Sequence, residues 1–411
     1  MMNQQIVIVH SDDMCEPREQ AMEMSHWEEA AFLDSAPIHS STINEPIPPV
    51  EVQDSDDEII IGAGIGGGSE CLDDTIPINT EKRSRTVEVR REYALTELMA
   101  MFSDPALMEL ELDVRIKHQN GQLEPGHGSG VFRDCLSEFW SEFYSRCTLG
   151  ADVRVPYLRH EYQIQEWQSI ARILVKGWLA VGYFPGQLSL PFMEEALYGT
   201  TYSSIKDSFM HYVSKQDKEI LEQALDSFQS VDQESLIETL DVHECHQIPT
   251  ADNISALLSQ LGHKALIQTP MFVIECWRPI LKTLAETLTP QRLSDLVLKQ
   301  VPTSKRVKDI LMFPPEMNST QNRVAKNLKR YIGEMTESDL KLFLRFCTGA
   351  DLLLGKEITV TFTETSDFQC RPVALTCSCN LVIPVNYQNY PDLRADFDSI
   401  LHSSVWVMDI G

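Results

Sequence analysis

The sequence predicts an α+β fold in which a large helical part is followed by a small mixed part near the C-terminus. Apolar residues recur at helical spacing through most of residues 205–300, whereas strand-like alternation appears later, in Ile358–Phe362 and Leu381–Ile383. The first 83 residues are rich in Ser, Asp, Glu, Pro and Gly. Such a segment has little apolar surface to bury, so a disordered acidic tail is expected before the folded part.

The same periodicities place individual elements. A strand is predicted at Leu112–Lys117, and a glycine-rich turn at 121–130 leads into the next helix. Helices are predicted at Tyr93–Phe102, Val131–Tyr144, Trp167–Val181, Leu190–Tyr198, Lys341–Phe346 and Tyr390–Leu401, with a further short one possible near Glu19–Leu33 in the tail.

The charge distribution limits the classes of partner. The net charge is −27, and residues 1–80 hold 17 Asp and Glu but a single basic residue, Arg18. Phosphate backbones and anionic lipid surfaces require clustered Lys and Arg, so neither nucleic acid nor a membrane is an expected partner. The sequence contains no run of about 18 apolar residues, so it predicts no membrane helix, and Met1–Gln5 does not resemble a signal peptide. The ten cysteines lack disulfide-framework spacing, which favours an intracellular, reducing location.

Two segments carry a family resemblance. Phe346–Gly349 reads Phe-Cys-Thr-Gly, and Arg371–Pro384 reads Arg-Pro-Val-Ala-Leu-Thr-Cys-Ser-Cys-Asn-Leu-Val-Ile-Pro. These motifs resemble the C-lobe of HECT ubiquitin ligases. Gly130–Trp140, and Ile170–Gly182 followed by Leu-Pro-Phe at 190–192, are similar to the N-lobe of the same family. The resemblance covers 84–411 and is looser in the middle of that range. The sequence pattern is similar to that of a divergent branch of the family, the G2/M-phase-specific ligase type.

The resemblance implies a bilobal HECT-like fold and a ubiquitin ligase. It places a larger, mainly helical N-lobe at 84–317 and a small mixed C-lobe at 318–411, with a flexible polar hinge near Met317–Asn322. Residues 204–268 would contain a divergent docking site for a ubiquitin-conjugating enzyme. Cys377 would carry ubiquitin as a thioester, with Thr376 beside it. The implied partners are a ubiquitin-conjugating enzyme and ubiquitin, with no cofactor.

The chemistry itself favours a cysteine on an exposed loop, because a partly ionised thiol is a strong nucleophile that a protein-sized donor can reach. The chain departs from the family pattern at Leu375, where the family has a histidine, and at Ser378-Cys379, which displaces an asparagine. Cys379 is therefore a second candidate nucleophile or a spare thiol. Trp406 corresponds to an aromatic residue that assists transfer in the family, with simple packing as the alternative. The departures also leave open an inactive HECT-like adaptor.

Three other patterns partly match known kinds of binding site. Gly62, Gly64 and Gly67 satisfy a dinucleotide-binding motif, but no crossover helix follows and acidic residues precede it, so a flavin or nicotinamide enzyme is a weak alternative. His243–His246 and Cys377–Cys379 could suggest metal. Neither has the paired spacing of a zinc site, so no metal is expected.

The tail carries a separate binding signal. Ile6, Val7, Ile8 and Val9 precede an acidic cluster, and Ile59, Ile60 and Ile61 follow one. These runs resemble SUMO-interacting motifs, in which a β-branched strand adds to a sheet edge and acids pair with a basic rim. Binding of SUMO or SUMO-modified proteins would favour the nucleus, although no basic import cluster is evident. The expected location is the nucleus, the cytoplasm or both.

Overall fold

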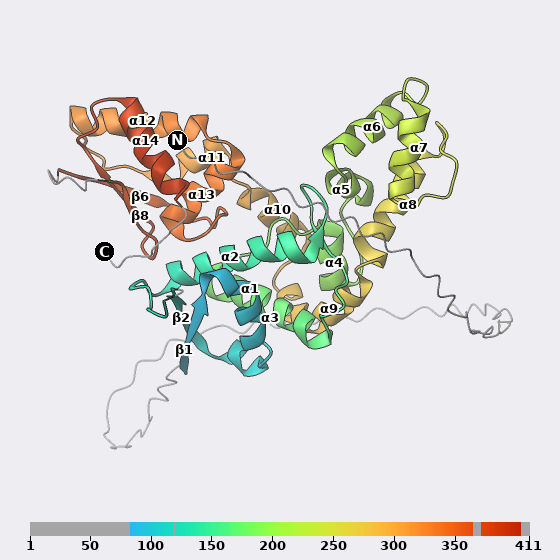
Figure 1. Ribbon diagram of the computed structural model, residues 1–411, viewed down its shortest axis with the longest axis horizontal. Coiled ribbons are helices and arrows are strands. Elements are labelled where there is room, and N and C mark those ends of the chain that lie inside the picture. The colour runs from blue at the N-terminus through green and yellow to red at the C-terminus, as the bar shows by residue number, and fades with distance from the viewer. Residues whose placement is uncertain (1–82, 119, 365–370, 404–411) are drawn as a thin grey trace, which may run out of the picture. The chain divides into compact units, whose positions relative to one another are not determined.

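The computed structural model describes residues 83–118, 120–364 and 371–403. It is α+β and mostly helical with small sheets, as predicted (Figure 1). The predicted tail motifs at Ile6–Val9 and Ile59–Ile61, and Trp406, lie outside the described residues. No helix in the described ranges has the length and apolar character that crossing a membrane would require.

The first part of the fold combines one parallel strand pair with packed helices. Strand β1 pairs in parallel with β2, with Val87 opposite Val114, and α1 packs against β1 and against helices α2 and α3. Helix α9 packs against α3 and α4. The bounds are β1 Ser84–Arg90, α1 Ala94–Met101, β2 Glu111–Lys117, α2 Ser129–Cys147, β3 Thr148–Leu149, β4 Val155–Pro156, α3 Ile164–Val181, α4 Leu190–Tyr198, α9 Met271–Ala285 and α10 Pro290–Gln300, with 3-10 turns η1 Arg91–Tyr93 and η2 Pro105–Glu109.

Between α4 and α9, four shorter helices pack mainly on one another. Their polar faces are exposed, and a serine or aspartate caps the first turn of α5, α6 and α7, as expected for surface helices. The π-helical turn η3 joins the last of them to α9. The bounds are α5 Ile205–Tyr212, α6 Lys215–Asp226, α7 Gln233–Val242, α8 Ile254–His263 and η3 Lys264–Gln268.

The last part of the fold is a four-stranded mixed sheet with helices. Its strand order is β5-β6-β8-β7, with β5, β6 and β8 parallel and β7 antiparallel to β8. Helix α13 packs on β7 and β8 and contacts α14, which also contacts α12 (Figure 1). The bounds are α11 Ser304–Asp309, β5 Leu311–Met312, α12 Ser319–Glu334, α13 Glu337–Thr348, β6 Ile358–Thr363, β7 Val373–Leu375, β8 Asn380–Pro384 and α14 Tyr390–Leu401.

The buried apolar residues form two clusters. The first cluster runs from Val87 to Leu293 and also takes in Ala350 and Leu352, from the segment that follows α13. The second cluster contains the remaining core from Val307 to Leu401. The described chain therefore crosses from one cluster to the other after α10 and returns briefly after α13, which brings the end of α13 close to α2.

The prediction of a flexible connector at Met317–Asn322 is wrong. Asn318 is the N-cap of α12, and its side chain accepts hydrogen bonds from the backbone N–H groups of Thr320 and Gln321. The Gln321 side chain in turn accepts from the backbone of Asn318. The polar run that suggests a connector is thus a capping box, which orders the first turn of a helix.

Candidate active site

Cys377 lies in the tight turn that joins β7 to β8. Leu375 and Asn380 are paired at the end of the hairpin, and the backbone N–H of Cys379 donates to the carbonyl of Thr376 at 3.4 Å. Cys379 adopts a positive φ of 52°, a conformation that few residues other than glycine take up. The turn leaves Cys377 and Ser378 exposed and buries the residues on either side of them, since Thr376 is 7% exposed and Cys379 is 4% exposed.

The thiol of Cys377 contacts the segment that begins α2. Its Sγ donates a hydrogen bond to the carbonyl oxygen of His127 at 2.8 Å. A Cβ placed on Gly130 would lie 2.5 Å from Thr376 Oγ1 and 2.8 Å from the backbone nitrogen of Cys377. Only a residue without a side chain permits this approach, so Gly130 lets the cysteine turn lie directly on the start of the helix.

Arg133 lies one turn further along α2. It donates hydrogen bonds to two segments of the C-terminal part of the fold, the end of α13 and the cysteine turn. Its Nε donates to the carbonyl of Thr348 at 2.6 Å, and one terminal nitrogen donates to the carbonyl of Thr376, also at 2.6 Å. That nitrogen lies 3.8 Å from Cys379 Sγ. The guanidinium is fully buried, and desolvation lowers the pKa of Arg133, an effect that the nearby Cys379 and Cys377 oppose.

Ion pairs surround this contact. Arg345 on α13 binds Asp134 at 2.6 Å and Glu138 at 2.7 Å, both on α2. Burial alone would lower the pKa of Arg345, but the two carboxylates raise it above its usual value. Arg91 also binds Asp134, as well as Glu124 at 3.1 Å. The carboxylates on this face of α2 therefore pair with Arg91 and Arg345.

A series of hydrogen bonds continues along α2 beyond Arg133. Ser137 Oγ has two acceptors within reach, the carbonyl of Arg133 at 3.0 Å and that of Gly349 at 3.2 Å, and it accepts from the backbone N–H of Asp351 at 3.2 Å. The hydroxyl of Tyr183 donates to the Asp351 carboxylate at 2.7 Å. Desolvation raises the pKa of Asp351, and the hydrogen bond from Tyr183 opposes it. These contacts anchor the segment after α13 in the first cluster.

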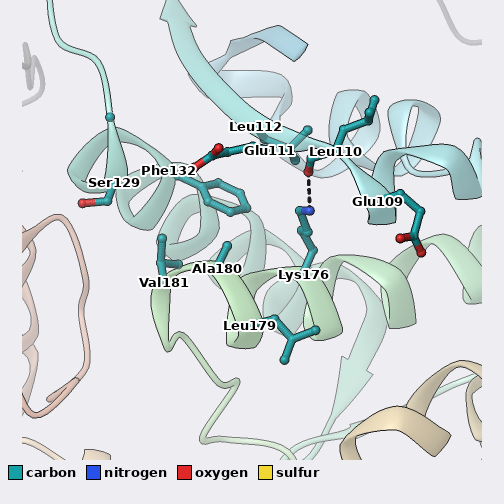
Figure 2. A pocket seen from close by; sticks show the side chains of 11 residues that line it. Glu109, Leu110, Glu111, Leu112, Ser129, Phe132, Lys176, Leu179, Ala180 and Val181 are labelled. Carbon is teal, nitrogen blue, oxygen red and sulfur yellow. Dashed lines mark hydrogen bonds between the residues drawn. The ribbon is translucent and has the colours of Figure 1, made fainter. Parts of the chain in front are cut away.

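A cavity of about 540 Å³ opens beside the start of α2 (Figure 2). Gly128, which lines it, is also the residue whose Cβ position lies 3.4 Å from Cys377 Sγ. Lys176 reaches across the cavity wall and donates to the carbonyls of Met108 at 3.1 Å and Leu110 at 2.5 Å. Desolvation lowers the pKa of Lys176. The cavity thus adjoins the residues that hold the cysteine turn.

The structure brings some predicted site residues together and separates others. Cys377 and Thr376 lie together on the turn, with Leu375 half-buried at its base. The side chain of Cys379 is buried against Arg133, a poor position for a nucleophile that must meet another protein. The described residues hold no grouping of three or more His, Cys, Asp or Glu suited to a metal ion.

Sequence reasoning missed Arg133 and the carbonyl of His127. Arg133 stands in the Gly130–Trp140 segment that carries the resemblance, but helical periodicity places it only on a helix and not beside a cysteine 244 positions later. A signal was present nonetheless. Arg133 and Asp134 interrupt an otherwise apolar stretch of the helix, and such charges are buried only when they are paired or hydrogen-bonded.

Comparison with known proteins finds a family match in the last third of the chain. The family model of the HECT domain (ubiquitin-transferase) matches residues 274–404. The match includes Cys377 and the whole second cluster, whereas α2 and Arg133 precede it. A search of the curated proteins finds no match. The family resemblance seen in the C-terminal motifs is confirmed, while the particular branch stays a prediction.

Proposed function

Residues 274–404 form a HECT-type, ubiquitin-transferase domain, and from this premise we propose that the chain is a ubiquitin ligase that carries ubiquitin on Cys377. The observation that supports this assignment most directly is the position of Cys377. It is the exposed cysteine among the described thiols, at the tip of a hairpin inside the matched region. The six other described cysteines are buried.

The proposed reaction has two transfers. The Cys377 thiolate attacks the thioester carbonyl of a charged conjugating enzyme, and that enzyme's cysteine leaves as a thiolate, which takes up a proton. A lysine amine then attacks the new thioester, loses a proton, and displaces Cys377 as a thiolate. The energy comes from the donor thioester, so the proposal requires no cofactor.

Docking of the conjugating enzyme is proposed for 204–268. Helices α5 to α8 occupy this region, and it carries exposed apolar side chains that the local core does not use. Ile237 and Val242 on α7 are 47% and 74% exposed, and Ile248 in the following loop is 83% exposed. A contiguous exposed apolar patch is typical of protein-binding surfaces, and these three side chains are the residues that we propose to form it.

The delivery step requires movement between the two clusters. Since Asn318 begins a helix, we place the pivot instead between α10, which ends at Gln300, and α11, which begins at Ser304. Arg306 bridges the two sides by donating to the carbonyls of Leu298 and Val301. A short connector of this kind suits a hinge, because few residues need to change φ and ψ.

The second candidate function is an inactive adaptor with a HECT-like domain. Leu375 favours it, because an apolar side chain at the base of the cysteine turn removes the histidine that the family places there. In that case the tail runs Ile6–Val9 and Ile59–Ile61 would recruit SUMO-modified partners, with a nuclear location.

The test is thioester formation. Purified full-length protein is mixed with ubiquitin-charged conjugating enzymes and run on non-reducing gels, with Cys377→Ala and Cys379→Ala as variants. A thiol-sensitive ubiquitin adduct that is lost in Cys377→Ala and retained in Cys379→Ala is the expected result. No adduct across a broad panel of conjugating enzymes would favour the adaptor, and loss only in Cys379→Ala would move the nucleophile.

A further inference from the structure

We infer that Arg133 is a positioning residue for Cys377: it holds the cysteine turn on α2 and keeps a buried positive charge against that turn. The inference rests on the proposed role of Cys377 as the ubiquitin carrier. It assigns a function to a residue that lies outside the matched 274–404 region, and it makes the reactivity of the thiol depend on contact between the two clusters.

The hydrogen bonds of Arg133 are unusual for a buried cation. Within the described residues none of the ion pairs involves Arg133, since the neighbouring Asp134 and Glu138 are bound by other arginines. Its donors go to neutral acceptors: the carbonyls of Thr348 and Thr376, and Ser129 Oγ at 3.1 Å. A buried charge without a carboxylate partner destabilises the fold, so its presence here points to a role other than stability.

The geometry directs this charge to the cysteine turn. Two of the contacts, to the Thr376 carbonyl and to Cys379 Sγ, are made to residues on either side of Cys377. The interaction with the two thiols opposes the desolvation that lowers the Arg133 pKa. The guanidinium therefore bonds one residue of the turn and lies within 3.8 Å of the sulfur of another, so it fixes the backbone that carries Cys377. Arg133 thereby provides a polar, charged neighbour that Leu375 does not.

The other titratable groups around this contact include the ion-paired Asp134, Glu138, Arg91 and Arg345. Cys379 lies on the turn itself, Cys347 on α13 interacts with Cys379, and His127 precedes α2. Desolvation is the main cause that raises the pKa of Cys347, so this thiol stays protonated at neutral pH.

Contact between the clusters is required for this arrangement. Arg133 belongs to the first part of the fold, whereas Thr348 and Thr376 belong to elements of the second. If the two separate, the cation remains on α2 and the thiol leaves it. The inference therefore predicts a thiol that is most reactive when its turn lies on α2 and less reactive when it does not.

The experiment measures alkylation of Cys377 in the full-length protein. Iodoacetamide is added between pH 5.5 and 9, and peptide-resolved mass spectrometry follows the rate at Cys377. Arg133→Gln is expected to lower the rate at pH 7 by about five- to tenfold, because the turn loses both a bond that holds it on α2 and the neighbouring cation. Arg133→Lys keeps the charge, so it is expected to recover much of the rate. A purely structural role predicts no advantage of Lys over Gln, since both lose the two-carbonyl bridge.

A second variant separates charge from folding. Gly130→Ala leaves Arg133 intact but places a Cβ 2.5 Å from Thr376 Oγ1, which should push the turn off the helix. It is expected to lower the alkylation rate in the same direction, with α2 unharmed because alanine favours helices. Arg146→Gln is the control: it removes an exposed arginine at the other end of α2, where it pairs with Glu142, and a rate within about twofold of the wild type is expected.

The alkylation results test the role of Arg133 and do not test the ligase activity. Unchanged rates and pH profiles in both Gly130→Ala and Arg133→Gln would overturn it, as would equal rates for Arg133→Lys and Arg133→Gln. If Arg133→Gln does not fold, judged by its thermal unfolding, Gly130→Ala decides. The assay contains no ubiquitin, so a missing ubiquitin adduct with a normal Arg133 effect would remove the ligase proposal and leave the inference in place.

Discussion

The thiol of Cys377 donates to the carbonyl oxygen of His127 at 2.8 Å, across 250 positions of the chain. A thiol is a weak donor, so this bond adds little to the contact compared with the two 2.6 Å bonds from Arg133. Its significance is chemical. Acylation of the sulfur removes the proton that the bond needs, so a loaded cysteine cannot make this contact. The bond therefore exists only for the unloaded thiol.

Gly349→Ala is predicted to weaken the contact between the two clusters. Gly349 has a φ of +80°, and a Cβ there would lie 2.2 Å from the carbonyl oxygen of Gly130. Gly355 is the matched control, because its φ is +69° but nothing lies within 4 Å of its Cβ position. Each substitution is expected to destabilise by about 1–2 kcal/mol through the backbone alone. Thermal unfolding should show a clearly larger loss for Gly349→Ala, and equal losses would contradict the close approach.

Cys379 is predicted to be a spare thiol. It is 4% exposed and contacts Arg133, whereas Cys377 is exposed at the tip of the turn. Brief treatment of the native protein with a maleimide should therefore label Cys377 well before Cys379, as read by peptide mapping. Cys379→Ser should keep the ubiquitin adduct. Faster labelling of Cys379 would show that the turn exposes the other thiol in solution.

His243 is predicted to make the α5–α8 region sensitive to mild acid. Desolvation lowers its pKa below the usual 6.5, with a smaller opposing effect from Asp217, and its Nε2 is buried without a partner among the described residues. The unfolded chain therefore binds a proton more readily than the folded one, so stability is lost as the pH falls below about 6.5. Hydrogen exchange of α5–α8 amides should increase between pH 7.5 and 5.5, after correction for the intrinsic exchange rate.

The control for this effect is His243→Phe, which removes the titrating group. A phenyl ring keeps the edge-to-face packing on Phe209, for which the ring centroids lie 5.1 Å apart in the wild type. This variant should show a smaller pH response in the same amides. An identical response in both proteins would assign the acid sensitivity to another group.

Ile248→Asp combined with Val242→Asp is predicted to impair loading by the conjugating enzyme. Both side chains are among the most exposed apolar groups of the described residues, so the substitutions should leave the fold intact. Loss of apolar anchors at an interface is expected to slow adduct formation by about tenfold or more. Leu298→Asp on α10, 60% exposed, is the control and should load normally. Normal loading by the double variant would place docking elsewhere.

Much of the fold follows from local patterns. Leu190–Tyr198 and Tyr390–Leu401 are helices with the predicted bounds, because a regular apolar stripe is flanked by clear stop signals, such as Gly199. Strand β1 at Ser84–Arg90 was missed, since only Val87 and Val89 alternate and its partner β2 lies beyond a helix. The polar run at 317–322 predicted a connector but caps a helix, because the same residue types serve both purposes.

The sequence by itself determined the α+β class, the principal helices and the choice of Cys377, since periodicity and motif order are local properties of the chain. Only the tertiary structure decided what surrounds that cysteine. The close approach of Gly130 to Thr376 and the hydrogen bonds from Arg133 join residues more than 200 positions apart. The same packing buries Cys379. Such pairs form because two packed surfaces meet, and no local pattern records which residues will lie at that contact.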